Sequence, residues 1–128
     1  MGKAVSDRLY SIFQLRREFL NELRSHIPKS QPEVPVNIST KKGQQHCRDL
    51  ALRGVEEMFE ALQHLKNWKT HKLTEDPEFD REEFLEEIVD AFNYFFALLI
   101  SVDCDEDEFF DAFLKKDKII HERLENKY

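Results

Sequence analysis

Residues 84–102 read FLEEIVDAFNYFFALLISV, and this stretch decides the fold class. Fourteen of its nineteen residues are apolar, and the five polar ones lie along one side at helical spacing. A helix that is apolar almost all round belongs at the centre of a helical bundle. We therefore expect an all-α protein in which residues 77–102 form a central helix, with Asp76 as its N-cap and Pro77 as its first residue.

Three further segments show helical periodicity. Residues 5–26 repeat apolar side chains at intervals of three and four, until the prolines that follow end the pattern. Residues 44–69, which follow Gly43, and residues 105–126 have the same spacing. With 128 residues the chain is expected to form one domain, residues 1–128, built as a four- to five-helix bundle.

The net charge of −7 is unevenly distributed along the chain. Residues 75–111 carry 15 acidic side chains against 1 basic one, whereas the segments on either side are net basic. Proteins that bind nucleic-acid polymers normally present a dominant basic face, so we expect no such partner. The longest apolar run, residues 91–100, is half of the ~20 residues that cross a membrane. The two cysteines form no Cys-x-x-Cys pair, which favours a reducing cytoplasm.

Two pairs of carboxylates stand three residues apart on the expected helices. Glu57 pairs with Glu60, and Glu87 pairs with Asp90. Residues at this spacing have Cβ atoms about 5–6 Å apart on one helix face, so antiparallel packing of the two helices would bring four carboxylates together. Hard oxygen ligands of this kind suit Mg²⁺, with Mn²⁺ as a substitute.

These acids have two interpretations. Most glutamate pairs at this spacing are solvated surface residues, and either pair alone favours that interpretation. The metal interpretation gains weight because Glu57 lies on a stripe of small and apolar residues that runs from Leu50 to Trp68, and because Glu87 and Asp90 interrupt an otherwise apolar helix. Carboxylates on an inward face are costly unless they are paired or bound to metal.

The acid pairs resemble the signature of the all-α NTP pyrophosphatase superfamily, which includes MazG-like enzymes and the dimeric dUTPases. The chain carries Glu56-Glu57-x-x-Glu60 and, after 26 intervening residues, Glu87-x-x-Asp90. Three segments are similar to the dUTPase branch: HLKNWK at 64–69 resembles Phe-Lys-x-Trp-Lys, EEIVDAFNYF at 86–95 resembles Glu-Glu-hydrophobic-x-Asp-Ala-x-His-Phe, and KDKIIHER at 116–123 resembles Lys-Asn-Lys-x-Asn-x-x-Arg. The resemblance covers residues 44–128, with a weaker match at Asn21.

The resemblance implies Mg²⁺-dependent hydrolysis of a deoxynucleoside triphosphate, most of all dUTP, to the monophosphate and pyrophosphate. Glu60 would either take the proton of the attacking water or serve only as a ligand. Trp68 would either frame the base or pack in the core. The implied residues are Glu57, Glu60, Glu87 and Asp90 as metal ligands, Lys69, Lys116, Arg123 and Tyr128 as phosphate contacts, and Asn21, Trp68 and Asn93 as nucleoside contacts.

Two departures from the family pattern leave the substrate open. Asn93 stands where many relatives have a His, and Ile120 stands where an Asn is usual. Because an amide both donates and accepts, Asn93 could read cytosine as well as uracil, so a MazG-like activity of broader specificity, on dCTP for example, is the alternative. A non-catalytic helical interaction module is the second alternative. The apolar helix also predicts a homodimer, or a tetramer, that covers it.

Overall fold

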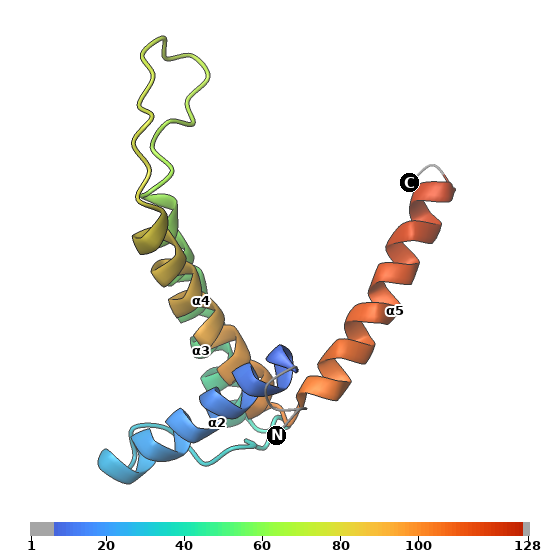
Figure 1. The fold of residues 1–128 in the computed structure, drawn as a ribbon. Helices are drawn as coiled ribbons and strands as arrows, with labels where there is room; N and C mark the ends of the chain where they lie inside the picture. Colours follow the sequence, from blue (N-terminus) through green and yellow to red (C-terminus); the bar gives the residue numbers. More distant parts are fainter. Residues whose placement is uncertain (1–6, 127–128) are drawn as a thin grey trace. The chain divides into compact units, whose positions relative to one another are not determined.

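The computed structural model describes residues 7–126, and the regular structure in that range is entirely helical (Figure 1). The predicted all-α class is therefore confirmed. None of the described helices combines the length and apolar character that a membrane crossing needs. The helices are α2 (Arg8–His26), α3 (Lys41–Leu62), α4 (Arg81–Ser101) and α5 (Glu106–Glu125).

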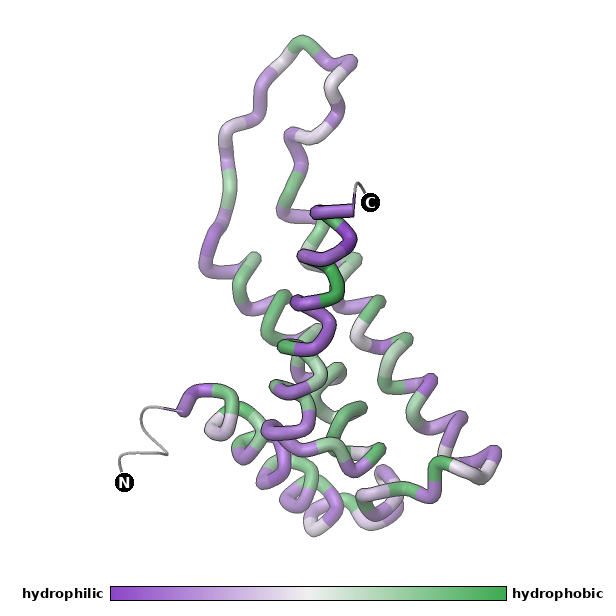
Figure 2. The backbone as a smooth tube through the Cα atoms, turned by 90° about the vertical axis from the view of Figure 1, so that its right-hand side faces the viewer, coloured by the Kyte–Doolittle hydropathy of each residue, from purple (hydrophilic) through white to green (hydrophobic). Residues whose placement is uncertain are grey.

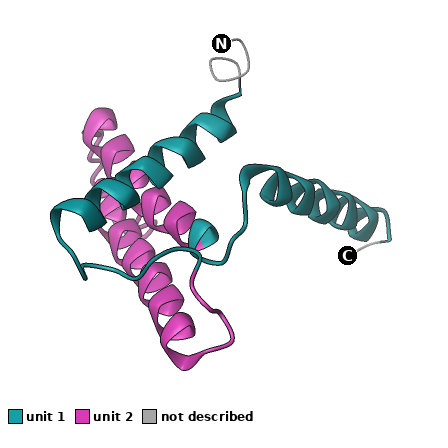
Figure 3. Cartoon of the chain, turned by 90° about the horizontal axis from the view of Figure 1, so that it is seen from below, with its two compact units in different colours: residues 1–35, 99–128 teal, residues 36–98 magenta. Residues whose placement is uncertain are grey.

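The chain divides into two compact units, which Figure 3 colours separately. The hairpin unit comprises residues 36–98 and contains α3 and most of α4. The terminal unit comprises residues 1–35 and 99–128 and contains α2 and α5. All four predicted metal ligands belong to the hairpin unit.

Within the hairpin unit, α3 and α4 pack antiparallel. The backbone of Gly54 lies against the ring of Phe95, while Glu57, further along α3, lies beside Asp90, which is earlier on α4. The apolar stripe predicted on α3 is confirmed from Leu50 to Ala61, which are buried together with Gly54. Figure 2 shows the corresponding alternation of hydrophobic and hydrophilic residues along the helices.

Gly54 permits the close approach of the two helices. A Cβ atom at this position would lie 2.4 Å from Cε1 of Phe95, well inside van der Waals contact. We expect Gly54→Ala to destabilise the fold by about 1 kcal/mol, because overpacking of ~1–3 kcal/mol exceeds the gain of ~1 kcal/mol in helix propensity. Urea unfolding of the single variant and of Gly54→Ala/Phe95→Leu tests this. Equal losses in both variants would show that the ring does not set the helix spacing.

The structure corrects the predicted end of α3, which is Leu62 rather than Lys69. Beyond Leu62, the amides of Gln63, His64 and Leu65 donate to carbonyls three residues back, so the helix tightens and then stops. The predicted continuation of the apolar stripe to Trp68 is wrong, because Leu65 and Trp68 are exposed. Without burial of these side chains, no packing stabilises a further helical turn.

The start of α4 is also corrected, from Pro77 to Arg81. The side chain of Asp80 accepts a hydrogen bond from the amide of Glu83 at 3.1 Å, as an N-cap does. Asp76 instead accepts from the amide of Glu78, which closes a local turn. Residues 63–80 therefore form a long loop between the two helices, visible in Figure 1 as the extended connection.

The terminal unit is held by contacts between α2 and the first turn of α5. Phe13 is fully buried and its ring lies 6.3 Å from that of Phe109. Arg17 forms an ion pair with Glu106 at 2.7 Å. Asp105 caps α5 by accepting from the amide of Glu108, so the predicted start of this helix is confirmed.

Candidate metal centre

Three carboxylates from α3 and α4 meet in the hairpin unit. One oxygen from each of Glu57, Glu87 and Asp90 lies within 4.8 Å of the other two. Glu57 and Glu87 are half-buried, and Asp90 is exposed. The structure thus brings together three of the four acids that the sequence singled out, and it does so because their helices pack antiparallel.

The fourth acid, Glu60, stands beside the other two glutamates. Partial burial is the largest cause that raises the pKa of Glu57 above its usual value. Hydrogen bonding with Glu60 and repulsion by its charge raise this pKa further. The same causes, in the same order, raise the pKa of Glu87, while His64 opposes the shift. Asp90 adds repulsion to both. The four carboxylates therefore act as one electrostatic group.

The donor set fits a divalent cation. Oε2 of Glu87 is shielded from solvent and no hydrogen-bond donor reaches it within residues 7–126. A shielded carboxylate oxygen without a donor destabilises the folded protein unless a proton or a cation neutralises its charge. Carboxylate oxygens at this separation are the hard ligands that Mg²⁺ and Mn²⁺ accept. Residues Glu57, Glu87 and Asp90, with Glu60 adjacent, are the ones that would hold the ion.

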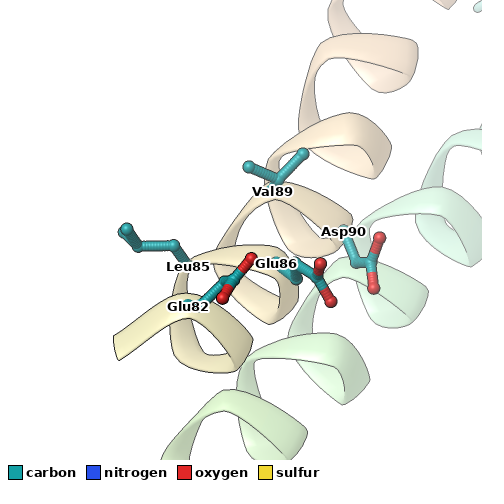
Figure 4. Close-up of a pocket in the computed structure, with 5 residues that line it drawn as sticks. All are labelled: Glu82, Leu85, Glu86, Val89 and Asp90. Atoms are coloured by element: carbon teal, nitrogen blue, oxygen red, sulfur yellow. The ribbon is translucent and has the colours of Figure 1, made fainter. Parts of the chain in front are cut away.

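A row of acids on α4 extends from this cluster. Glu82, Glu86 and Asp90 follow one another at four-residue intervals and, with Leu85 and Val89, line an open hollow of about 450 Å³ (Figure 4). Glu82 and Glu86 remain exposed. They add negative potential along the approach to the cluster, toward the first turn of α4.

The loop of residues 63–80 lies next to the ends of α3 and α4 that are nearest to the cluster. It is closed by Asn67, whose Nδ2 donates to Glu75 at 2.8 Å, and it surrounds an open hollow of about 440 Å³. His64 and Trp68 both line this hollow. Since His64 also acts on Glu87, it links the loop with the carboxylates.

Trp68 is exposed to 68%, so core packing is the wrong interpretation of this residue in the described chain. Lys69 places its Nζ 5.5 Å from the centre of the indole ring. Both residues line a second open hollow, of about 660 Å³, in the same loop. Volumes of this order match those of small-molecule sites.

Two lysines in this second hollow were missed in the sequence. Lys66 and Lys72 line it together with Lys69. The signal was a lysine at every third position from 66 to 72, which gives the loop three cations beside an aromatic ring. Such a surface favours a phosphorylated ligand.

Asn93 and Trp68 lie on opposite sides of the carboxylates along the hairpin. Asn93 is half-buried on α4, three residues beyond Asp90 and away from the loop. Trp68 belongs to the loop that joins the end of α3 to the start of α4. The structure therefore does not gather these two predicted nucleoside contacts around one base.

The remaining predicted residues belong to the terminal unit. Asn21 is exposed on α2, where its side chain accepts a hydrogen bond from Arg24. Lys116 and Arg123 are exposed on α5. Tyr128 lies outside the described residues, as does the start of the helix predicted from residue 5.

Comparison of the chain with protein-family models, with curated proteins and with solved structures gives no match.

Proposed function

We propose that this protein is a Mg²⁺-dependent nucleoside triphosphate pyrophosphohydrolase that converts dUTP to dUMP and pyrophosphate. The observation that carries the proposal is the convergence of Glu57, Glu87 and Asp90 within 4.8 Å, with Glu60 beside them. A triphosphate is the natural ligand of such a centre, because Mg²⁺ on one or two carboxylates keeps coordination positions for phosphate oxygens.

The position of each carboxylate suits it to one of two roles, metal ligand or proton acceptor. When bound, Mg²⁺ would neutralise phosphate charge and lower the pKa of a coordinated water. Glu57, Glu87 and Asp90 would hold the ion, and Glu60, which is exposed beside them, would accept the proton of the attacking water. Mn²⁺ can replace Mg²⁺ with the same oxygen ligands.

The hairpin also orients the substrate. Asn93 lies on one side of the carboxylates, and Lys66, Lys69 and Lys72 lie in the loop on the other. The base therefore contacts Asn93, and the terminal phosphates extend toward the lysines. In this arrangement Trp68 covers the phosphate end and holds Lys69 in place.

The outer face of α4 supports a homodimer. Leu85, Val89 and Phe92 are exposed to 45%, 56% and 48%, at spacings of four and three residues that place them on one stripe. A second copy of the chain that covers this stripe would remove it from water. Two such self-complementary contacts on one chain would give a tetramer.

A nucleotide panel tests the proposal. We expect pyrophosphate release from dUTP in the presence of Mg²⁺ or Mn²⁺, and its complete loss in EDTA. A comparison of dUTP, dCTP and dITP decides between a dUTPase and an enzyme of broader specificity, which the amide of Asn93 also permits. Metal-dependent release from none of the deoxynucleotides would overturn the proposal and leave a non-catalytic helical module.

A further inference from the structure

The first part of the loop between α3 and α4, residues 63–73, is basic, whereas the segment that follows it is acidic. It contains three lysines and no acidic side chain, while residues 75–90 contain nine acids and one arginine. Lys66, Lys69 and Lys72 are exposed, and none of them forms an ion pair in the part of the chain that the structure describes. Three unpaired cations that line one hollow form a surface that attracts an anion from outside the chain.

The hollow that these lysines line begins within one helical turn of the carboxylate cluster. Gln63 lines the hollow, and its backbone amide donates to the carbonyl of Glu60 at 3.1 Å. Gln63 follows Glu60 by three residues, a spacing that places two side chains on one helix face. A chain of phosphates that starts at the carboxylates can therefore continue into the hollow.

The loop has internal contacts that keep its cations available. Nδ2 of Asn67 donates to Glu75 at 2.8 Å, which closes residues 67–75 into a ring and occupies the acid nearest in sequence to Lys72. The ring contains Lys69, whose Nζ lies 5.5 Å from the centre of the indole of Trp68. The hollow of about 660 Å³ has ample room for two phosphate groups.

We propose that this lysine hollow, lined by Lys66, Lys69, Lys72 and Trp68, binds a pyrophosphate group and thereby makes the protein select nucleoside triphosphates over diphosphates. The selectivity rests on the proposed function, which places the bond to be hydrolysed at the carboxylates. Beyond that bond dUTP extends two phosphates and dUDP only one, so only dUTP fills the hollow with a pyrophosphate group. Lysine suits this task, because its compact charge carries three donors for phosphate oxygens.

The fluorescence of Trp68 measures binding to the hollow directly, because Trp68 is the single tryptophan of the chain. We expect inorganic pyrophosphate to change the emission of the full chain saturably in metal-free buffer. Half of the change should require a concentration at least about tenfold lower than with inorganic phosphate, since the second phosphate adds charge-assisted hydrogen bonds to lysine. Constant ionic strength removes general screening from the comparison. No saturable change, or the same response to both anions, would overturn the proposal.

Lys66→Gln/Lys72→Gln is expected to raise the pyrophosphate concentration for half of the change at least about tenfold, because it removes two of the three cations. Lys41→Gln/Lys42→Gln is the matched control. These two exposed lysines begin α3, about 30 Å along the helix from the hollow, and their loss removes the same charge from the same unit. The control should stay within about twofold of the wild type. Equal weakening in both variants would mean unspecific attraction by charge and would overturn the site.

The preference for dUTP over dUDP tests the selectivity. With Mg²⁺, kcat/KM for dUTP should exceed that for dUDP at least about tenfold in the wild type, and Lys66→Gln/Lys72→Gln should bring the ratio close to one. The Mg²⁺ concentration for half of the maximal rate should not change, because the lysines are not metal ligands. An unchanged ratio would overturn the selectivity. A pyrophosphate response in a protein that hydrolyses no nucleotide would support the site and overturn only the enzymatic function, whereas hydrolysis without the response would overturn only the site.

Discussion

Glu87→Gln and Asp90→Asn are each expected to reduce Mg²⁺-dependent pyrophosphate release from dUTP by at least about 100-fold, because groups that only support metal ligands already account for ~10–100-fold. Each substitution keeps the size of the side chain and removes the negative charge of one of the three converging oxygens. The Mg²⁺ concentration that gives half of the maximal rate should rise in both variants, which separates weaker metal binding from a loss of substrate contacts.

Glu56→Gln is the matched control for these substitutions. Glu56 is exposed on α3, directly before Glu57, and does not belong to the converging group. Its replacement removes the same charge from the same helix and should leave the rate within about twofold, as for surface substitutions away from a site. If all three variants kept the wild-type rate, the carboxylate cluster would not be the catalytic centre.

The sequence predicted the carboxylate cluster because two helical periodicities agreed with each other. Leu50, Gly54 and Ala61 are buried on α3, and the acids at 57 and 87 are half-buried where the two stripes meet. Packing of Gly54 against Phe95 fixed the register of α3 and α4, and this register brought the acids together. The position of these acids on an apolar helix stripe was sufficient to predict that they meet, because helices pack along the same three- and four-residue spacing.

The loop of residues 63–80 could not be predicted in the same way. Its first residues continue the helical spacing of α3, but Leu65 and Trp68 meet no partner that would bury them. Asp76-Pro77 has the composition of a helix start, yet Asp80 provides the cap that the structure uses. Local signals of similar strength compete at such positions, and the surrounding packing decides between them. The lysines of the loop became a candidate site only once their common hollow was known.

Without metal, the protein is expected to lose stability as the pH rises, and Mg²⁺ is expected to restore it. Burial and neighbouring acids raise the pKa values of Glu57 and Glu87 in the folded chain. The folded chain therefore binds more protons than the unfolded chain above the usual carboxyl pKa of about 4.3, so the free energy of unfolding falls as the pH rises through the raised values. In EDTA, Glu87→Gln should melt at the wild-type temperature near pH 4 and above it at pH 7.

The stabilising effect of metal is expected to differ in size between the two proteins. At pH 7, Mg²⁺ at 100 times its dissociation constant should stabilise the wild type by about 2.7 kcal/mol, because it binds the folded chain alone. Glu87→Gln should gain far less, since it lacks one of the converging oxygens. Thermal melts at constant ionic strength, with Glu56→Gln as the control, separate this binding from general screening of charge. A Glu87→Gln protein that melts below the wild type in EDTA at pH 7 would show that the clustered charges do not repel one another, and the metal centre would lose its electrostatic basis.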